Sequence, residues 1–240
     1  MTKIQEELFE KIIKLKPSIK VEKQTKDGWE SMSRIEYIKI NDNSINFYNF
    51  KAHLDTIQKR HYMNQFCLNE ISKDCENRQL SGKEEKNKIK EKDHRFHPNF
   101  LIQCEYFMFS IKTIFDTILK ILKYIFPEED IKGFGQIQSW NDDDKMKRLL
   151  GENVEWLDNF NKLRNRLTHD TIAGISSSFN HNIKAEVLTY SKRKLSIRKK
   201  NEQSGETFQL PDYFEESFKK TDTVISNFYE LLLNQKYNDK

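Results

Sequence analysis

The segment DNFNKLRNRLTHD, residues 158–170, combines side chains that can bind a phosphate and move a proton. Arg164 carries a permanent charge on a planar group whose N–H donors match two phosphate oxygens. His169 can take up or release a proton near neutral pH. Asp158 can orient either of these side chains, and Asn165 precedes His169 by about one helical turn.

An arginine paired with a histidine suits the cleavage of RNA by its own 2′-hydroxyl group, which DNA lacks. The histidine deprotonates the hydroxyl or protonates the leaving oxygen, and the arginine stabilises the crowded phosphate. We therefore predict neither a metal ion nor another cofactor. Arginine and histidine near a helix C-terminus are also ordinary on a solvent-facing helix, because cations there complement the helix dipole. The side chains alone leave both interpretations open.

The string RNRLTH, residues 164–169, resembles the RN-x-x-x-H form of the R-x(4–6)-H signature of HEPN domains. These domains are helical bundles found in toxin–antitoxin, abortive-infection and CRISPR-linked nucleases. Asp158, six residues before Arg164, is similar to an aspartate of the kinase-extension nucleases related to HEPN. The resemblance covers roughly residues 96–236.

This resemblance implies a homodimer in which both protomers contribute Arg164 and His169 to one composite cleft. It implies metal-independent cutting that leaves a 2′,3′-cyclic phosphate, with Asn165 and Asp158 in supporting roles. Expected partners are RNA, a second copy of the chain, and an antitoxin or regulatory protein. Two alternatives stay open: a non-catalytic HEPN module that binds RNA, a nucleotide or a protein, and a structural helical dimer with a chance motif.

The spacing of apolar residues predicts that the motif lies on a helix over 152–170. A helical residue turns about 100° from its predecessor, so four apolar side chains fall on one side. These are Trp156, Phe160, Leu163 and Leu167. Asp158, Asn165 and His169 fall on the other side, and Arg164 lies at the border.

The other elements are also predicted from periodicity and punctuation. Helices are expected over 3–15, 51–78, from Pro98 to about Phe126, from about Asn141, and from Asp212 onward. The third of these is apolar around most of its circumference, which is typical of the centre of a bundle. Strand pairs are expected at 35–40 with 45–48, around an Asn/Asp-rich turn, and at 185–190 with 194–199.

Two of these helices have candidate inward faces. In the helix over 51–78 they are Leu54, Ile57, Tyr62, Phe66 and Ile71. In the last helix they are Phe214, Phe218, Thr221, Ile225, Phe228 and Leu232.

Composition favours a mainly α fold. The 240 residues are 36% hydrophobic and 32% charged, with only 7 Gly and 4 Pro, which favours helices over many short strands. We expect an N-terminal α+β extension over 1–95, which resembles nothing we can name. A HEPN-like helical bundle with small β-hairpin elements is expected over 96–240.

The net charge of +4 permits nucleic acid as a partner. The candidate RNA-backbone contacts are Arg166, Lys192, Arg193, Lys194 and Arg198. The cluster from 192 onward is equally compatible with the solvated tip of a hairpin.

Three further groups were weighed as sites. His94 with His97 and the run Asp142–Asp144 are interpreted as helix-entry residues in preference to metal ligands. The three cysteines are odd in number and lack CxxC spacing, which predicts reduced thiols, with Cys104 as a small core residue. The segment 100–126 is too charged for a bilayer span, and the first residues have no apolar signal-peptide core. We expect a cytoplasmic protein without membrane contact.

Overall fold

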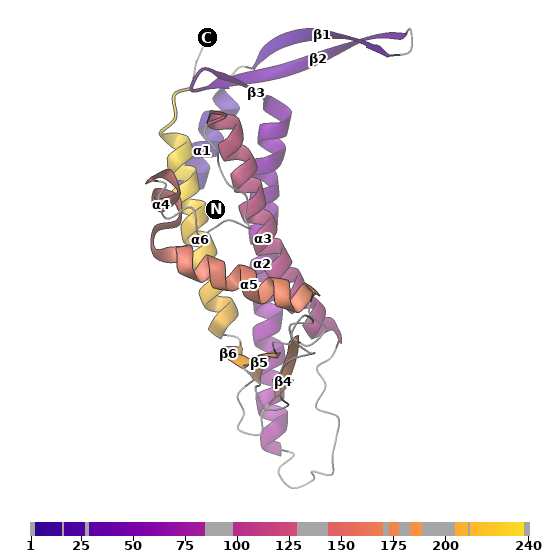
Figure 1. The fold of residues 1–240 in the computed structure, drawn as a ribbon, viewed down its shortest axis with the longest axis vertical. Coiled ribbons are helices and arrows are strands. Elements are labelled where there is room, and N and C mark those ends of the chain that lie inside the picture. Colours follow the sequence, from indigo (N-terminus) through magenta and orange to yellow (C-terminus); the bar gives the residue numbers. More distant parts are fainter. Residues whose placement is uncertain are drawn as a thin grey trace, which may run out of the picture. The chain divides into compact units, whose positions relative to one another are not determined.

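The computed structural model describes residues 3–15, 17–26, 29–84, 98–128, 144–169, 173–177, 183–188, 205–210 and 212–237. These residues are mainly helical, as predicted (Figure 1). The helices are α1 (Lys3–Lys14), α2 (Phe47–Glu84), α3 (Pro98–Ile125), α4 (Asp144–Leu150), α5 (Val154–His169) and α6 (Asp212–Leu233), with a 3₁₀ turn at Gly151–Asn153. The strands are β1 (Ser18–Lys26), β2 (Trp29–Ile40), β3 (Asn43–Asn46), β4 (Ala173–Ser177), β5 (Ile183–Leu188) and β6 (Gly205–Leu210).

Two compact units are each assembled from separate segments of the chain. Unit 1 contains Met1–Lys59, Thr113–Glu152 and Asp222–Lys240, and unit 2 contains Arg60–Lys112 and Asn153–Thr221. The helices α2, α3 and α6 therefore contribute residues to both units. The boundary predicted after residue 95 lies outside the described residues, so the division into 1–95 and 96–240 stays a prediction.

A three-stranded antiparallel sheet, in the order β1-β2-β3, belongs to unit 1. Its β2–β3 hairpin turns at Asn41 and Asp42, whose φ angles are 49° and 67°. Both angles are in the left-handed region that a two-residue hairpin turn requires, and Asn and Asp tolerate it best after glycine. The predicted strand pair around this turn is confirmed for 35–40 and for residues 45 and 46, whereas Phe47 and Tyr48, predicted to end the second strand, begin α2. The strand β1 was not predicted from the sequence.

Residues close to the end of α6 fix the turn of this hairpin. The Asn41 N–H donates to the carbonyl of Lys236 over 2.9 Å, and the Lys236 N–H donates to Asn41 Oδ1 over 3.1 Å. An isolated bridge joins Ile40 to Tyr237. Unit 1 is therefore held together by hydrogen bonds between residues far apart in the sequence.

The inward face of α2 was only partly predicted. Leu54, Ile57 and Ile71 are fully buried as expected, but Tyr62 is 72% exposed and Phe66 is 54% exposed. The latter two predictions are wrong because the buried stripe of α2 advances by three or four residues and misses both positions. Other buried positions on α2 are Phe50, Asn64, Cys67 and Cys75.

The predicted inward face of α6 is confirmed at five positions. Phe214, Thr221, Ile225, Phe228 and Leu232 are each at most 3% exposed. The sixth, Phe218, is only half-buried, and His61 stacks on its ring with 4.7 Å between ring centres. In unit 2, Phe214 also meets Phe107 of α3 edge to face at 5.1 Å. Aromatic contacts of this kind join α2, α3 and α6 within unit 2.

A second three-stranded antiparallel sheet, in the order β4-β5-β6, follows α5 in unit 2. The strand predicted at 185–190 corresponds to β5, but β4 and β6 pair with its two sides. The predicted pairing of this strand with 194–199 is wrong, because β5 has β4 along one edge and β6 along the other. Residues 194–199 lie outside the described residues. Both β4 and β5 contact α5.

Leu163 of α5 is 3% exposed, so Leu163→Ala should lower the free energy of unfolding by about 2–5 kcal/mol through lost packing and a cavity. The control is Phe66→Ala, because Phe66 is also in unit 2 but more than half exposed. It should change stability by less than about 0.5 kcal/mol. Urea unfolding followed by circular dichroism measures both. Equal midpoints for the two variants would mean that the faces of α5 are assigned the wrong way round.

Candidate functional site

The apolar side of α5 is buried in unit 2. Phe160 is fully buried, Leu163 is 3% exposed and Trp156 is 9% exposed. Leu157, between them, is also fully buried. The predicted stripe is confirmed at these positions, while the side chain of Leu167 lies outside the described residues. Because this side is buried, the polar side of α5 faces solvent.

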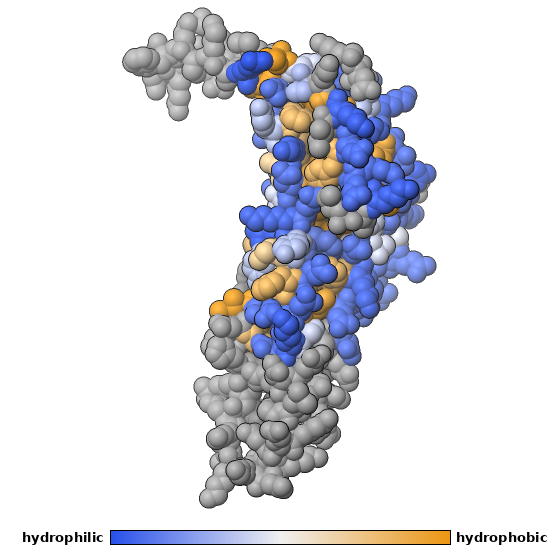
Figure 2. All heavy atoms as spheres, turned by 180° about the vertical axis from the view of Figure 1, so that it is seen from behind, coloured by the Kyte–Doolittle hydropathy of each residue, from blue (hydrophilic) through white to orange (hydrophobic). Residues whose placement is uncertain are grey.

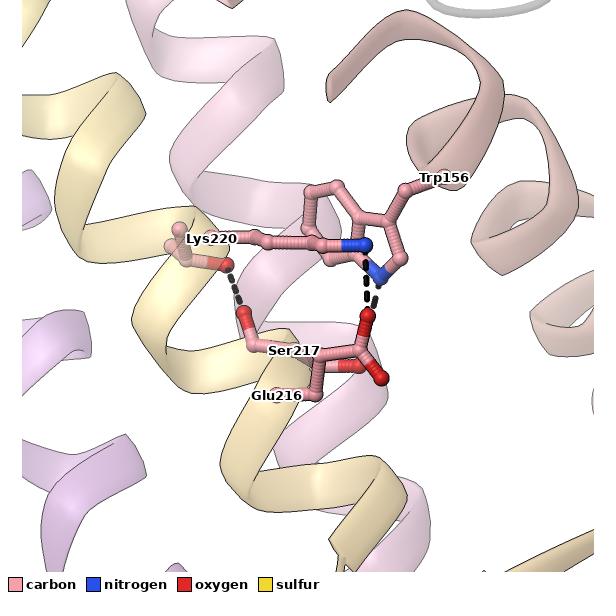
Figure 3. Close-up of polar contacts among 5 residues, drawn as sticks. Trp156, Glu216, Ser217 and Lys220 are labelled. Atoms are coloured by element: carbon pink, nitrogen blue, oxygen red, sulfur yellow. Dashed lines mark hydrogen bonds and ion pairs between the residues drawn. The ribbon is translucent and has the colours of Figure 1, made fainter. Parts of the chain in front are cut away.

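Trp156 connects α5 to α6. Its Nε1–H donates to Ser217 Oγ over 3.4 Å, and the ammonium of Lys220 lies 5.8 Å from the centre of a Trp156 ring. Lys220 also forms an ion pair with Glu216 at 2.6 Å (Figure 3). A directional hydrogen bond inside an apolar contact restricts the rotation of α5 about its own axis.

Arg164 and Asn165 lie together on the polar side of α5. Arg164 is half-buried and Asn165 is exposed. The Nη1–H of Arg164 donates to Asn165 Oδ1 over 2.9 Å. The guanidinium carbon of Arg164 lies 5.9 Å from the ring centre of Phe109 on α3, a cation–π distance. These two neighbours position a guanidinium group at the protein surface.

Asp158 lies on the same helix and pairs with Lys162, one turn later, at 2.6 Å. The side chain of Asp158 is 21% exposed and that of Lys162 is 52% exposed. An i,i+4 pair of this kind stabilises the helix itself. The predicted role of Asp158, orienting Arg164 or His169, stays a prediction.

Several predicted site residues lie beyond the described side chains. His169 is the last residue of α5, and its side chain, like that of Arg166, is outside the described part. So are Lys192, Arg193, Lys194 and Arg198. The backbone places Arg164 and His169 in the last two turns of α5, about 140° apart around an ideal helix.

Phe109 is the residue of this site that sequence reasoning missed. The segment 100–126 was interpreted as core, yet Phe109 is 48% exposed. A signal was present in the spacing of charges. Glu105 precedes it by four residues and Lys112 follows it by three, so the three share one face of α3. An aromatic residue at the centre of a charged face is expected to reach solvent.

Two other properties of the described residues bear on the site. Among them, no group of three or more His, Cys, Asp or Glu side chains is placed to hold a metal ion. His94, His97, Asp142 and Asp143 fall outside this part of the chain. None of the helices, within the same residues, has the length and apolar character needed to cross a membrane. The face seen in Figure 2 is mostly hydrophilic where it is coloured, with smaller hydrophobic areas.

Comparison with known proteins gives no match to a family model, a curated protein or a solved structure. The HEPN resemblance therefore depends on residues 164–169 and on Asp158.

The three cysteines belong to the core of unit 2. Cys67, Cys75 and Cys104 are 5%, 1% and 2% exposed, which confirms the core position predicted for Cys104. Burial raises the pKa of the Cys67 thiol. It also raises the pKa of Cys104, with smaller contributions from neighbouring groups such as Cys75 and Glu105. A thiol with a raised pKa stays protonated at neutral pH, and the protonated form is a poor nucleophile.

We expect the folded protein to react slowly with 5,5′-dithiobis(2-nitrobenzoic acid) at pH 8, because all three thiols are buried and a raised pKa keeps Cys67 and Cys104 protonated. In guanidinium chloride all three should react quickly, and absorbance at 412 nm counts them. One thiol equivalent that reacts in the folded protein as fast as free cysteine would contradict this burial.

Proposed function

We propose that this protein is a HEPN-type endoribonuclease that cuts RNA without a metal ion and acts as a toxin or anti-phage defence effector. The observation that carries the proposal is the position of Arg164. Its guanidinium is held at the surface by Asn165 and Phe109, on the helix that His169 ends. Cleavage of RNA by its own 2′-hydroxyl needs a phosphate-binding group and a proton-transfer group, and Arg164 and His169 are these two groups in the proposal.

In this proposal Arg164 binds the phosphate, and Asn165 orients the guanidinium group of Arg164. A guanidinium has five N–H donors, and Asn165 accepts from one Nη of Arg164. This bond fixes the plane of the group, and the fork then pairs with two oxygens of the scissile phosphate and stabilises its extra negative charge in the transition state. His169 takes the proton of the 2′-hydroxyl or gives one to the departing 5′-oxygen.

A second protomer completes the site in this proposal. Arg164 and His169 point about 140° apart around one ideal helix, so a single chain brings both to one phosphate with difficulty. A twofold axis beside the C-terminal end of α5 places each residue next to its counterpart from the other chain. Arg166 and the basic cluster from Lys192 to Arg198 then contact the RNA backbone beyond the cleft.

Purified protein should cut total RNA in the presence of EDTA, and His169→Ala and Arg164→Ala should each reduce the rate by about 100-fold or more. Arg148→Ala is the matched control, since Arg148 is an exposed arginine on α4, in unit 1. It removes the same charge and should leave the rate unchanged. Gel electrophoresis measures cutting, and circular dichroism verifies the fold of each variant.

Recovery of activity only after magnesium or manganese is added to chelated protein would reject the metal-independent mechanism. Equal losses of cutting rate in Arg164→Ala and Arg148→Ala would show that the rate depends on the total charge of the protein and not on this site. Tight RNA binding without cutting, in all variants, would favour a non-catalytic HEPN module.

Excess His169→Ala protein mixed with wild type should reduce the activity of each wild-type chain, because heterodimers have only one intact histidine. Subunit exchange is verified first, by energy transfer between differently labelled chains. Activity proportional to the amount of wild type alone, despite proven exchange, would mean that each protomer works by itself.

A further inference from the structure

The outward-facing ring of Phe109 is one of several exposed aromatic rings among the described residues, and it lies next to Arg164. It is 48% exposed, and its neighbours on the same face of α3 are the charged residues Glu105 and Lys112. Leaving so much of a phenylalanine ring in water forgoes the gain that burial would bring. An exposed apolar ring next to a candidate catalytic arginine calls for a functional explanation.

The contact between Phe109 and Arg164 indicates which kind of ligand the exposed ring would bind. The guanidinium lies 5.9 Å from the centre of the Phe109 ring, and it is also hydrogen-bonded to Asn165. A planar ring and a positive group that binds phosphate are therefore fixed side by side on two different helices, α3 and α5, of unit 2. A nucleotide presents the complementary pair of features, a flat base and a phosphate.

We infer that Phe109 and Arg164 form a nucleotide subsite in which the Phe109 ring stacks on the RNA base next to the phosphate held by Arg164. This inference rests on the proposed function. Proteins that bind single-stranded RNA stack bases on aromatic side chains and hold the backbone with cations. Stacking tolerates any base, so the subsite selects single-stranded RNA over duplex RNA without reading the sequence.

The charges around the Phe109 ring determine where the bound RNA strand runs. Glu105 is exposed one turn before Phe109, and its carboxylate repels phosphate. Lys112, less than one turn after Phe109, is half-buried and attracts it. The backbone of the bound strand therefore runs past Arg164 and Lys112, away from Glu105. A protein partner would instead use Phe109 together with the exposed Ile102, which lies two turns earlier on α3.

Two substitutions separate stacking from a general apolar contact. Phe109→Leu keeps an apolar side chain but removes the ring, whereas Phe109→Trp keeps a ring. We expect Phe109→Leu to raise KM for a single-stranded RNA oligonucleotide by roughly 5- to 100-fold, with a smaller change in kcat. Phe109→Trp should stay close to wild type. The matched control is Phe66→Leu, another exposed phenylalanine of unit 2, which should change nothing.

A modified substrate tests the partner of the ring. After the cutting position is mapped, an oligonucleotide without the base beside that phosphate is compared with the intact one. Wild type should lose the same factor on the abasic RNA that Phe109→Leu loses on intact RNA, and Phe109→Leu should lose nothing more. Equal loss on the abasic RNA by both proteins would overturn the subsite. So would a Phe109→Leu protein that cuts normally, or one that sediments as a monomer where the wild type is a dimer, which would assign Phe109 to a protein interface.

Failure of the proposed function gives a different result. If wild type binds the oligonucleotide in a fluorescence anisotropy titration without cutting it, the nuclease proposal fails and the subsite is judged on binding. Weaker binding by Phe109→Leu with unchanged binding by Phe66→Leu then supports it, and equal binding overturns it. If wild type neither cuts nor binds single-stranded RNA, both proposals fall.

Discussion

Burial of the apolar side of α5 determines the direction of the polar groups used in the proposed chemistry. Leu163 and Arg164 are adjacent, so rotating the helix by about 100° exchanges leucine for arginine in the interior. Burying an unpaired guanidinium costs far more than exposing a leucine. The Trp156 N–H bond to Ser217 selects the same orientation. Packing, and not contact with a ligand, thus fixes where Arg164 and Asn165 point.

Elements with strong local signals could be predicted from the sequence. Pro98 begins α3 as expected for a residue with no N–H to satisfy, and the Asn41–Asp42 turn has the backbone that its residues favour. Tyr62 and Phe66, which were wrongly predicted to be buried, have no local signal of this kind. An aromatic residue on a long helix is predicted to be buried because its side chain is apolar. Its actual exposure depends on how the neighbouring helices pack against it. The missed strand β1 is rich in charge and alternates weakly, so periodicity did not reveal it.

The candidate site was predictable in its own helix and not beyond it. Side chains of one helix are related by a fixed rotation, so the separation of Arg164 and Asn165 from the apolar stripe follows from spacing. The approach of Phe109 to Arg164 joins residues of α3 and α5, and contacts between helices depend on crossing geometry that no short motif encodes. The charges on either side of Phe109 indicated that it faces outward, but not which side chain it meets.

The hydrogen bonds between the β2–β3 hairpin turn and Lys236 have a consequence for synthesis of the chain. Proteins generally begin to fold from the N-terminal side as they leave the ribosome. The hairpin forms early because its contacts are local, yet its turn waits for Lys236, which follows Asn41 by 195 residues. Unit 2 uses no residue after Thr221. All segments around Arg164 have therefore emerged before unit 1 can close.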